Sequence, residues 1–284
     1  IHAHDWRQGV TRAGVIPAKL LAEYTGGVAD WDIPVDLNMM AISREWDLIV
    51  HIGHVVPHEV LGFASHNKNY FIGLGGKETI CASHLAAASY GIENNLGRLT
   101  APLRACFNWA EREYLSHLPH VYLLLVMNRV PMDRLVHTRG AKRAKCVTRD
   151  HGAEGKLIHT GIFVGDDQET YLEAARASCR QNITTFDRPV KKIVATMHPD
   201  AFRSTWVANK AVYRTRMAID DGGELLIIAP GVDRFGEQPE VDAVIRRYGY
   251  RGSRRILDLF RRQAALRDLA HGAAHLIHGS SEGR

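Results

Sequence analysis

Residues 47–84 read DLIVHIGHVVPHEVLGFASHNKNYFIGLGGKETICASH, and the interpretation of the whole chain depends on this stretch. It begins as an apolar run rich in Ile and Val, which is typical of a buried central strand in an α/β sheet. Pro57 ends the run and places His58 just beyond the carboxyl end of the strand, where α/β sheets bind ligands. A Gly- and Asn-rich loop carrying Lys68 follows, and then a helix-like segment that holds His84.

Each of these three side chains has two interpretations. His58 is either a general base that works near neutral pH or a structural histidine bonded to nearby backbone. Lys68 is either an amine that loses its proton in a desolvated pocket and bonds covalently, or an ordinary exposed lysine. His84 is either a neutral metal ligand or a satisfied histidine of the core. None of them carries a functional assignment alone.

The composition is that of a soluble globular protein with a full core. Of the 284 residues, 45% are hydrophobic and 24% charged, enough for two ordinary domains or one large one. The net charge of +5 is spread along the chain, and the basic run at 139–149 reads as a solvated strand or hairpin face. We therefore expect no nucleic-acid partner, while a modest positive excess suits small carboxylate substrates.

The cysteines and the hydropathy indicate the compartment. Cys81, Cys106, Cys146 and Cys179 are far apart and form no CxxC pair, which favours a reducing environment. No apolar run reaches the length of a membrane span, and the first residues do not form a signal peptide. The sequence thus predicts a cytoplasmic protein with no membrane partner.

The chain alternates strand-like and helix-like segments, which predicts the α/β class. In the first part we expect helices at 16–24, 77–90, 101–118 and 166–180, the last capped by Asp166, strands at 33–40, 48–56 and 121–130, and a hairpin within 135–164.

A second α/β pattern begins after a connector at 182–188. We expect strands at 190–198 and 224–230, helices at 199–219, 240–248 and 253–270, and a turn at 221–223. The pattern predicts a catalytic domain at 1–182 and a closing domain at 183–284, with mostly parallel sheets and the site in the cleft between the domains.

Gly73 and Gly75 form a partial G-x-G motif before the helix at 77–90. The full dinucleotide fingerprint needs a third glycine and an acidic residue after a second strand, and neither can be assigned. A nicotinamide-dependent oxidoreductase is therefore a weak alternative.

Order and spacing give the sharper interpretation. The pattern PHEVxGFxxxNK places Lys68 ten residues after His58, and His84 follows sixteen residues later. This pattern resembles the nickel-pincer-dependent lactate racemase family, in a divergent racemase- or epimerase-like branch. The similarity extends to HDWR and IPVDLN upstream and to GIFVGDD, STWVANKAVYRT and HGSSEGR downstream.

The resemblance implies an isomerase that racemises or epimerises lactate-like or sugar 2-hydroxy acids. Lys68 would carry the nickel-pincer nucleotide, a pyridinium-3-thioamide-5-thiocarboxylate mononucleotide, as a covalent thioamide made by cofactor-synthesis enzymes. His84 would be the protein ligand of a square-planar nickel. His58 would be one of two acid/base histidines, coupling proton transfer to hydride transfer between the substrate and the cofactor.

The resemblance also places substrate-binding residues in the second domain. A cation there would bind the substrate carboxylate, and backbone amides of the loop at 279–284 suit anionic groups. The residues are Trp206, Asn209, Lys210, Tyr213 and Arg214.

Two departures from the family pattern leave an alternative open. Ser-Gly-Gly before the lysine is replaced here by residues 64–67, Ala-Ser-His-Asn, so that His66 either reshapes the cofactor pocket or adds a polar contact. The second acid/base histidine is expected upstream of Ile1, since His2 and His4 align with a later block. The chain thus resembles a fragment lacking amino-terminal and some carboxyl-terminal residues, and a non-catalytic metal- or anion-binding relative is the alternative.

Overall fold

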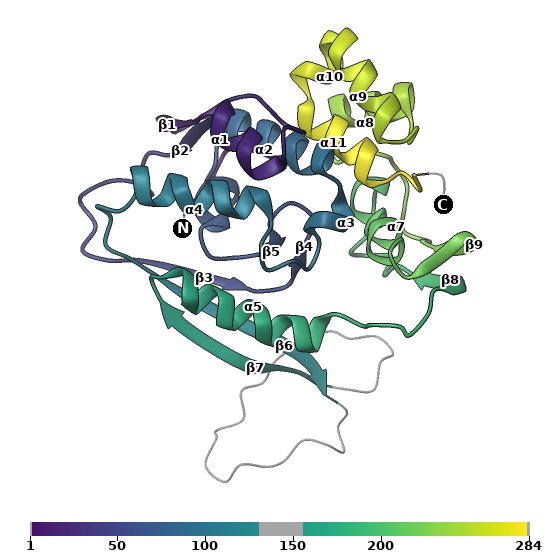
Figure 1. Ribbon diagram of the computed structural model, residues 1–284, viewed down its shortest axis with the longest axis horizontal. Helices are drawn as coiled ribbons and strands as arrows, with labels where there is room; N and C mark the ends of the chain where they lie inside the picture. Colours follow the sequence, from purple (N-terminus) through teal and green to yellow (C-terminus); the bar gives the residue numbers. More distant parts are fainter. Residues whose placement is uncertain (1, 131–155, 283–284) are drawn as a thin grey trace.

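A computed structural model describes residues 2–130 and 156–282 (Figure 1). The basic run at 139–149, Cys146 and most of the hairpin expected within 135–164 lie outside the described residues. The α/β class is confirmed, since helices and strands alternate through both described parts.

The chain opens with two antiparallel strands joined by a helix. β1 (Val10–Ile16) pairs with β2 (Ile33–Asn38), and α1 (Ala18–Thr25) lies between them in sequence. Pro17 is the N-cap of α1, and Gly26 ends it in the left-handed conformation, as is usual for a helix C-terminus. Ile33, Val35 and Leu37 of β2 are fully buried in the main core.

The largest sheet has the order β3, β6, β7. β3 (Ile49–His54) runs parallel to β6 (His120–Val130), and β7 (Lys156–Gly165) runs antiparallel to β6. α5 (Gln168–Asn182) covers one face of β6 and β7 (Figure 1). Its N-cap is Asp167, whose carboxylate accepts the Thr170 N–H at 2.8 Å, so the expectation of Asp166 was one residue early.

The prediction of a buried central strand at 48–56 is wrong for the described residues. β3 is an edge strand of the three-stranded sheet, and the side chains of its Ile/Val run alternate between the two faces of the sheet. His51 points into the core, whereas Val50 and Ile52 are 51% and 63% exposed. An apolar run does not distinguish burial on both faces from burial on one.

Between β3 and β6 the chain forms the region of interest. β4 (Pro57–His58) and β5 (Gly62–Phe63) make a tight antiparallel hairpin, and η1 (Asn69–Gly73) is one π-helical turn. α2 (Lys77–Tyr90) has the predicted bounds, and α3 (Ile92–Asn95) follows it. α4 (Pro102–Tyr114) buries the predicted face through Leu103, Phe107 and Ala110.

The last hundred residues differ more from expectation. β8 (Val190–Thr196) and β9 (Ile219–Ile228) are parallel, and the turn expected at 221–223 lies inside β9, next to a register shift. The single helix expected at 199–219 is two short ones, α6 (Thr205–Ala208) and α7 (Lys210–Thr215).

The final helices form a compact group against the first part of the chain. α8 (Pro239–Tyr248) has almost the expected bounds, whereas the helix expected at 253–270 breaks at Gln263 into α9 (Ser253–Arg262) and α10 (Ala264–Asp268). α11 (Ala270–His278) was not predicted beyond its first residue. It lies alongside α2, where Cys81, Leu85 and Ala88 share a core with Ile256 and Leu276 (Figure 1).

The sheets are mixed rather than mostly parallel. Of the five strand pairings in the described residues, only β3–β6 and β8–β9 are parallel. Short connections explain part of this difference, because a hairpin turn can join only antiparallel neighbours. Within the described residues, no helix combines the length and apolarity that crossing a membrane requires. The domain division after residue 182 stays a prediction.

Candidate functional site

The β4–β5 hairpin fixes the position of His58. Gly62 has φ +76°, and a Cβ there would overlap the carbonyl oxygen of Arg98, so only glycine fits the turn. His58 Nδ1 accepts the Val60 N–H at 3.2 Å, which places the proton of the neutral ring on Nε2. Burial lowers the pKa of His58 to about 3, against the opposing charge of Glu59. The ring is therefore neutral at physiological pH and can exchange a proton through Nε2.

Lys68 follows a buried loop and starts the turn η1. Burial is the main cause that lowers its pKa; Glu59 opposes this shift, and the positive charges of Arg104 and Lys210 add to it. A lysine with a lowered pKa has a larger fraction of neutral amine, which is the nucleophilic form.

His84 lies in the middle of α2 with one ring nitrogen occupied. Its Nδ1 lies 2.7 Å from the Ile80 carbonyl oxygen, so Nδ1 carries the proton and the Nε2 lone pair is free. Histidines that bind metals commonly hold their other N–H on a carbonyl in this way. Burial lowers the pKa of His84 and keeps the ring neutral, as a metal ligand must be.

The structure brings these three groups together. The charges of Lys68 and His84 both act on the pKa of His58, and Lys68 acts on that of His84. Three residues from a hairpin, a turn and a helix therefore share one electrostatic environment, although their metal-binding and catalytic roles remain predictions.

Glu59 lies among these groups and was not identified from the sequence. Burial alone would raise its pKa, but the charges of His58 and His278, with His84, outweigh burial and lower it to about 2. Tyr213 Oη donates to Glu59 Oε1 at 3.3 Å, which links the hairpin to α7. The carboxylate provides the negative charge in a site otherwise lined by bases.

Three histidines of α11 are the other residues that the sequence interpretation missed. His271, His275 and His278 are all buried, and among the described residues His278 Nε2 has no hydrogen-bond partner. His278 lies close enough to Glu59 and His84 to be electrostatically coupled to both. Their spacing of four and three residues in an Ala- and Leu-rich segment is a helical pattern that could have revealed them.

The expected substrate-binding residues divide into two groups. Lys210 affects the pKa of Lys68, and Tyr213 contacts Glu59, so both face the site. Trp206 stacks on His275 with 4.3 Å between ring centroids, and Asn209 is buried at the start of α7. Arg214 is exposed and lines a separate cavity. Arg216, two residues further on, is buried and bonded to Glu93 and to the Ser280 carbonyl.

The altered loop keeps a glycine-like backbone. Ser65 and His66, in the loop that replaces Ser-Gly-Gly, have φ angles of +70° and +58°. The His66 ring packs on Tyr122 with 4.0 Å between centroids, and its Nε2 lies 3.2 Å from the Asp167 carbonyl oxygen. His66 therefore occupies the core and leaves the backbone path of the loop intact.

His4 serves a structural purpose. Its Nε2 lies 3.0 Å from the Gly75 carbonyl oxygen, and its Nδ1 lies 3.0 Å from Asn38 Nδ2. With both ring nitrogens bonded, His4 ties the first residues to the start of α2 and has no nitrogen left for a metal or a proton relay.

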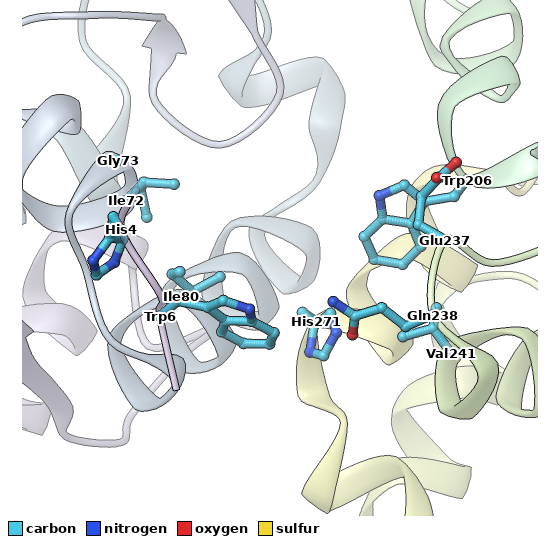
Figure 2. A pocket seen from close by; sticks show the side chains of 10 residues that line it. All are labelled: His4, Trp6, Ile72, Gly73, Ile80, Trp206, Glu237, Gln238, Val241 and His271. Carbon is cyan, nitrogen blue, oxygen red and sulfur yellow. The ribbon is translucent and has the colours of Figure 1, made fainter. Parts of the chain in front are cut away.

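A cavity of about 320 Å³ lies next to this region (Figure 2). Figure 2 shows the Trp6 indole on one side, with Trp206, Gln238 and His271 on the other. Ile80 of α2, one turn before His84, also lines it. A larger cavity of about 910 Å³ lies along residues 182–193. Neither is lined by His58, Lys68 or His84.

The donor set fits a metal that brings most of its own ligands. Within the described residues there is no group of three His, Cys, Asp or Glu side chains that could hold a metal ion. His84 offers a free imidazole nitrogen in the same electrostatic environment as the desolvated amine of Lys68. A nickel ion whose other donors come from a group attached to Lys68 fits this arrangement.

The partial G-x-G lacks the context of a dinucleotide site. That motif requires a strand before the glycines and a helix after them. Here the residues before Gly75 form the π-helical turn η1, and Gly76 donates its N–H to the Asp36 carbonyl at 2.7 Å.

The comparison with known protein families identifies the same region of the chain. Residues 24–94 match the lactate racemase N-terminal domain family, and this range contains His58, Lys68 and His84. No curated protein matches the chain significantly.

Two solved structures share the fold. One is a protein from Thermotoga maritima, with a TM-score of 0.76 and 22% identity over 98% of this chain and 62% of that chain. The other is the lactate racemase apoprotein from Thermoanaerobacterium thermosaccharolyticum, with a TM-score of 0.62 and 17% identity over 96% of this chain and 56% of that chain. The chain thus spans about three fifths of their lengths. The domain match over residues 24–94 confirms the resemblance to the lactate racemase family drawn from the sequence, and the two solved structures share the fold.

Proposed function

We propose that the chain is the cofactor-holding part of a nickel-pincer-dependent racemase or epimerase of 2-hydroxy acids. The observation that carries the proposal is the single environment shared by His58, Lys68 and His84, within the range that matches the lactate racemase N-terminal domain. A covalently attached nickel cofactor requires an amine that readily loses its proton and a free imidazole nitrogen.

In this proposal each side chain has one task. Lys68 would hold the nickel-pincer nucleotide through its amine, and His84 Nε2 would bind the nickel. The bound cofactor would supply the acceptor for a hydride from C2 of the substrate. His58 would exchange the hydroxyl proton at Nε2, which its neutral ring permits. Lys210 would attract the substrate carboxylate.

Intact mass and metal content test this proposal. The chain would be co-expressed with nickel-pincer cofactor-synthesis enzymes, purified, and measured for added mass on Lys68 and for bound nickel. We expect one cofactor and one nickel per chain, complete loss of added mass in Lys68→Ala, and unchanged mass in Lys19→Ala, which alters an exposed lysine of α1. His84→Ala should keep the added mass and lose nickel.

His58 is tested separately, since its proposed task begins after loading. His58→Ala should keep both the added mass and the nickel while losing any racemisation of 2-hydroxy acids at least a hundredfold, in line with the loss of an acid/base group. A wild-type chain without added mass or nickel would reject the cofactor assignment. Reversible nickel binding without turnover would instead support the non-catalytic relative.

A further inference from the structure

Arg104 is a buried cation that the proposed chemistry does not use. It projects from α4 and is only 2% exposed. Its guanidinium donates through Nη2 to the carbonyl oxygens of Phe63 at 2.7 Å and Ser65 at 3.3 Å, and through Nη1 to Asn67 Oδ1. It also stacks 4.1 Å from the ring centroid of Tyr171. Three of its partners lie in the loop directly before Lys68.

That loop needs an external support. Ser65 and His66 are consecutive residues in the left-handed region, where a Cβ is sterically unfavourable. Such a conformation persists only where the surrounding structure holds it. Arg104 hydrogen-bonds to the Phe63 carbonyl, the Ser65 carbonyl and the Asn67 side chain. These contacts lie before, within and after the strained pair Ser65–His66.

The charge of Arg104 is balanced through the same loop. Asn67, which accepts from Arg104, donates through Nδ2 to Glu111 Oε2 at 2.9 Å and to Asn108 Oδ1 at 2.8 Å. Glu111 also accepts the hydroxyl of Tyr122. The buried Arg104 and the partly buried Glu111 are thus joined by the amide of Asn67, and removing any member leaves the others with unpaired polar groups.

The loop transmits this order to Lys68. Asn67 is its direct neighbour, and the Asn67 carbonyl accepts the N–H groups of Tyr70 and Phe71 at 3.1 Å, at the start of η1. Asn67, which accepts a hydrogen bond from Arg104, therefore sets the direction in which the Lys68 side chain leaves the backbone. Arg104 also ranks among the charges that lower the pKa of Lys68, after burial.

We propose that Arg104 is a positioning residue for Lys68: it holds the left-handed Ser65 and His66 within the segment 63–67 and keeps a fixed positive charge near the amine. The inference deepens the proposed function, in which Lys68 carries the cofactor. Its test is made on the unmodified amine, so it does not depend on cofactor loading.

The test compares three variants of the full chain. Arg104→Gln removes the charge and the fork, Arg104→Lys keeps the charge without the fork, and Arg112→Gln removes a charge from an exposed position on the same helix. Two quantities are measured: hydrogen exchange of the peptide covering residues 63–71, and the pH profile of Lys68 acetylation by acetic anhydride, followed by peptide mass spectrometry.

We expect Arg104→Gln to speed exchange in this peptide at least tenfold and to shift the acetylation profile to higher pH, so that Lys68 carries about threefold less neutral amine at pH 8. Arg104→Lys should speed exchange similarly with a smaller shift of the profile, because one ammonium cannot reproduce the planar fork. Arg112→Gln should change neither.

A folded Arg104→Gln with unchanged exchange and an unchanged profile would overturn the proposal and leave Arg104 as a residue that only fills the core. If Arg104→Gln does not fold, Arg104→Lys is the test: hydrogen exchange should become faster in residues 63–71 than in the rest of the chain, and an unchanged rate there would overturn the proposal. A wild-type chain that never gains mass at Lys68 would reject the proposed function, whereas the results for Arg104 would stand.

Discussion

At the scale of single residues, the negative charge of Glu59 acts on every group of the candidate site. Glu59 is the carboxylate that faces Lys68, His58 and His84, and it opposes the effect of burial on the pKa of each. Without the Glu59 carboxylate, all three groups would hold a proton less readily.

Glu59→Gln should therefore make Lys68 more reactive. Loss of the negative charge lowers the pKa of Lys68 further, so the neutral fraction of the amine at pH 7.5 should rise about three- to tenfold. The rate of Lys68 acetylation measures this fraction. Glu113→Gln, which removes a charge from an exposed position of α4, is the matched control. An unchanged or slower rate in Glu59→Gln would show that Glu59 does not act on the amine.

At the scale of elements, the β4–β5 hairpin holds His58 through a turn that only glycine can make. Gly62 combines a positive φ of +76° with a backbone carbonyl where a Cβ would lie. Gly26, at the end of α1, has a positive φ of +64° with nothing near its Cβ position. Alanine at Gly26 costs only the free energy of backbone strain, whereas alanine at Gly62 adds the free energy of a steric clash.

Gly62→Ala should lower the free energy of unfolding by about 3 kcal/mol or more, since overpacking adds to the strain of a left-handed alanine. Gly26→Ala should cost only about 1–2 kcal/mol, the strain alone. Urea denaturation followed by circular dichroism measures both. Equal costs would mean that the hairpin relaxes around the new side chain, and the rigid presentation of His58 would then be wrong.

The helices show what local pattern can and cannot predict. The bounds of α2 were predicted because its sequence begins after Gly76 and stops at Gly91, and the buried face of α4 followed from its periodicity. α11 was missed because Gly272 and a Gly/Ser ending resemble a loop. It is helical because α2, α9 and α8 bury it almost completely.

At the scale of the whole molecule, buried histidines dominate the response to pH. Burial lowers the pKa to about 3 or about 4 at six positions: His51, His58, His66, His271, His275 and His278. The unfolded chain binds these protons near pH 6.5, whereas the folded chain binds them only in stronger acid. Stability from neutral histidines is thus fully present above pH 6.5 and is lost as the pH falls toward 4.

The chain should therefore be less stable at pH 5 than at pH 7.5, by up to about 2 kcal/mol for each such histidine. Urea denaturation at the two pH values measures the difference. The His51 ring contacts Tyr70 and Tyr122, and its buried Nε2 has no partner in the described part of the chain, so His51→Phe should reduce the acid sensitivity. Equal stability at both pH values would contradict the burial of neutral histidines.

The sequence by itself determined the α/β class, the bounds of α2, the resemblance to the lactate racemase family, and the spacing of His58, Lys68 and His84. These features depend on short stretches of chain, in which hydrophobic periodicity and the positions of Gly and Pro predict where helices and strands begin and end. Only the tertiary structure decided that Glu59 faces this trio, that α11 buries histidines beside it, and that Arg104 reaches back to the loop before Lys68. Those contacts join residues far apart in sequence, and they depend on packing and charge balance that no local pattern records.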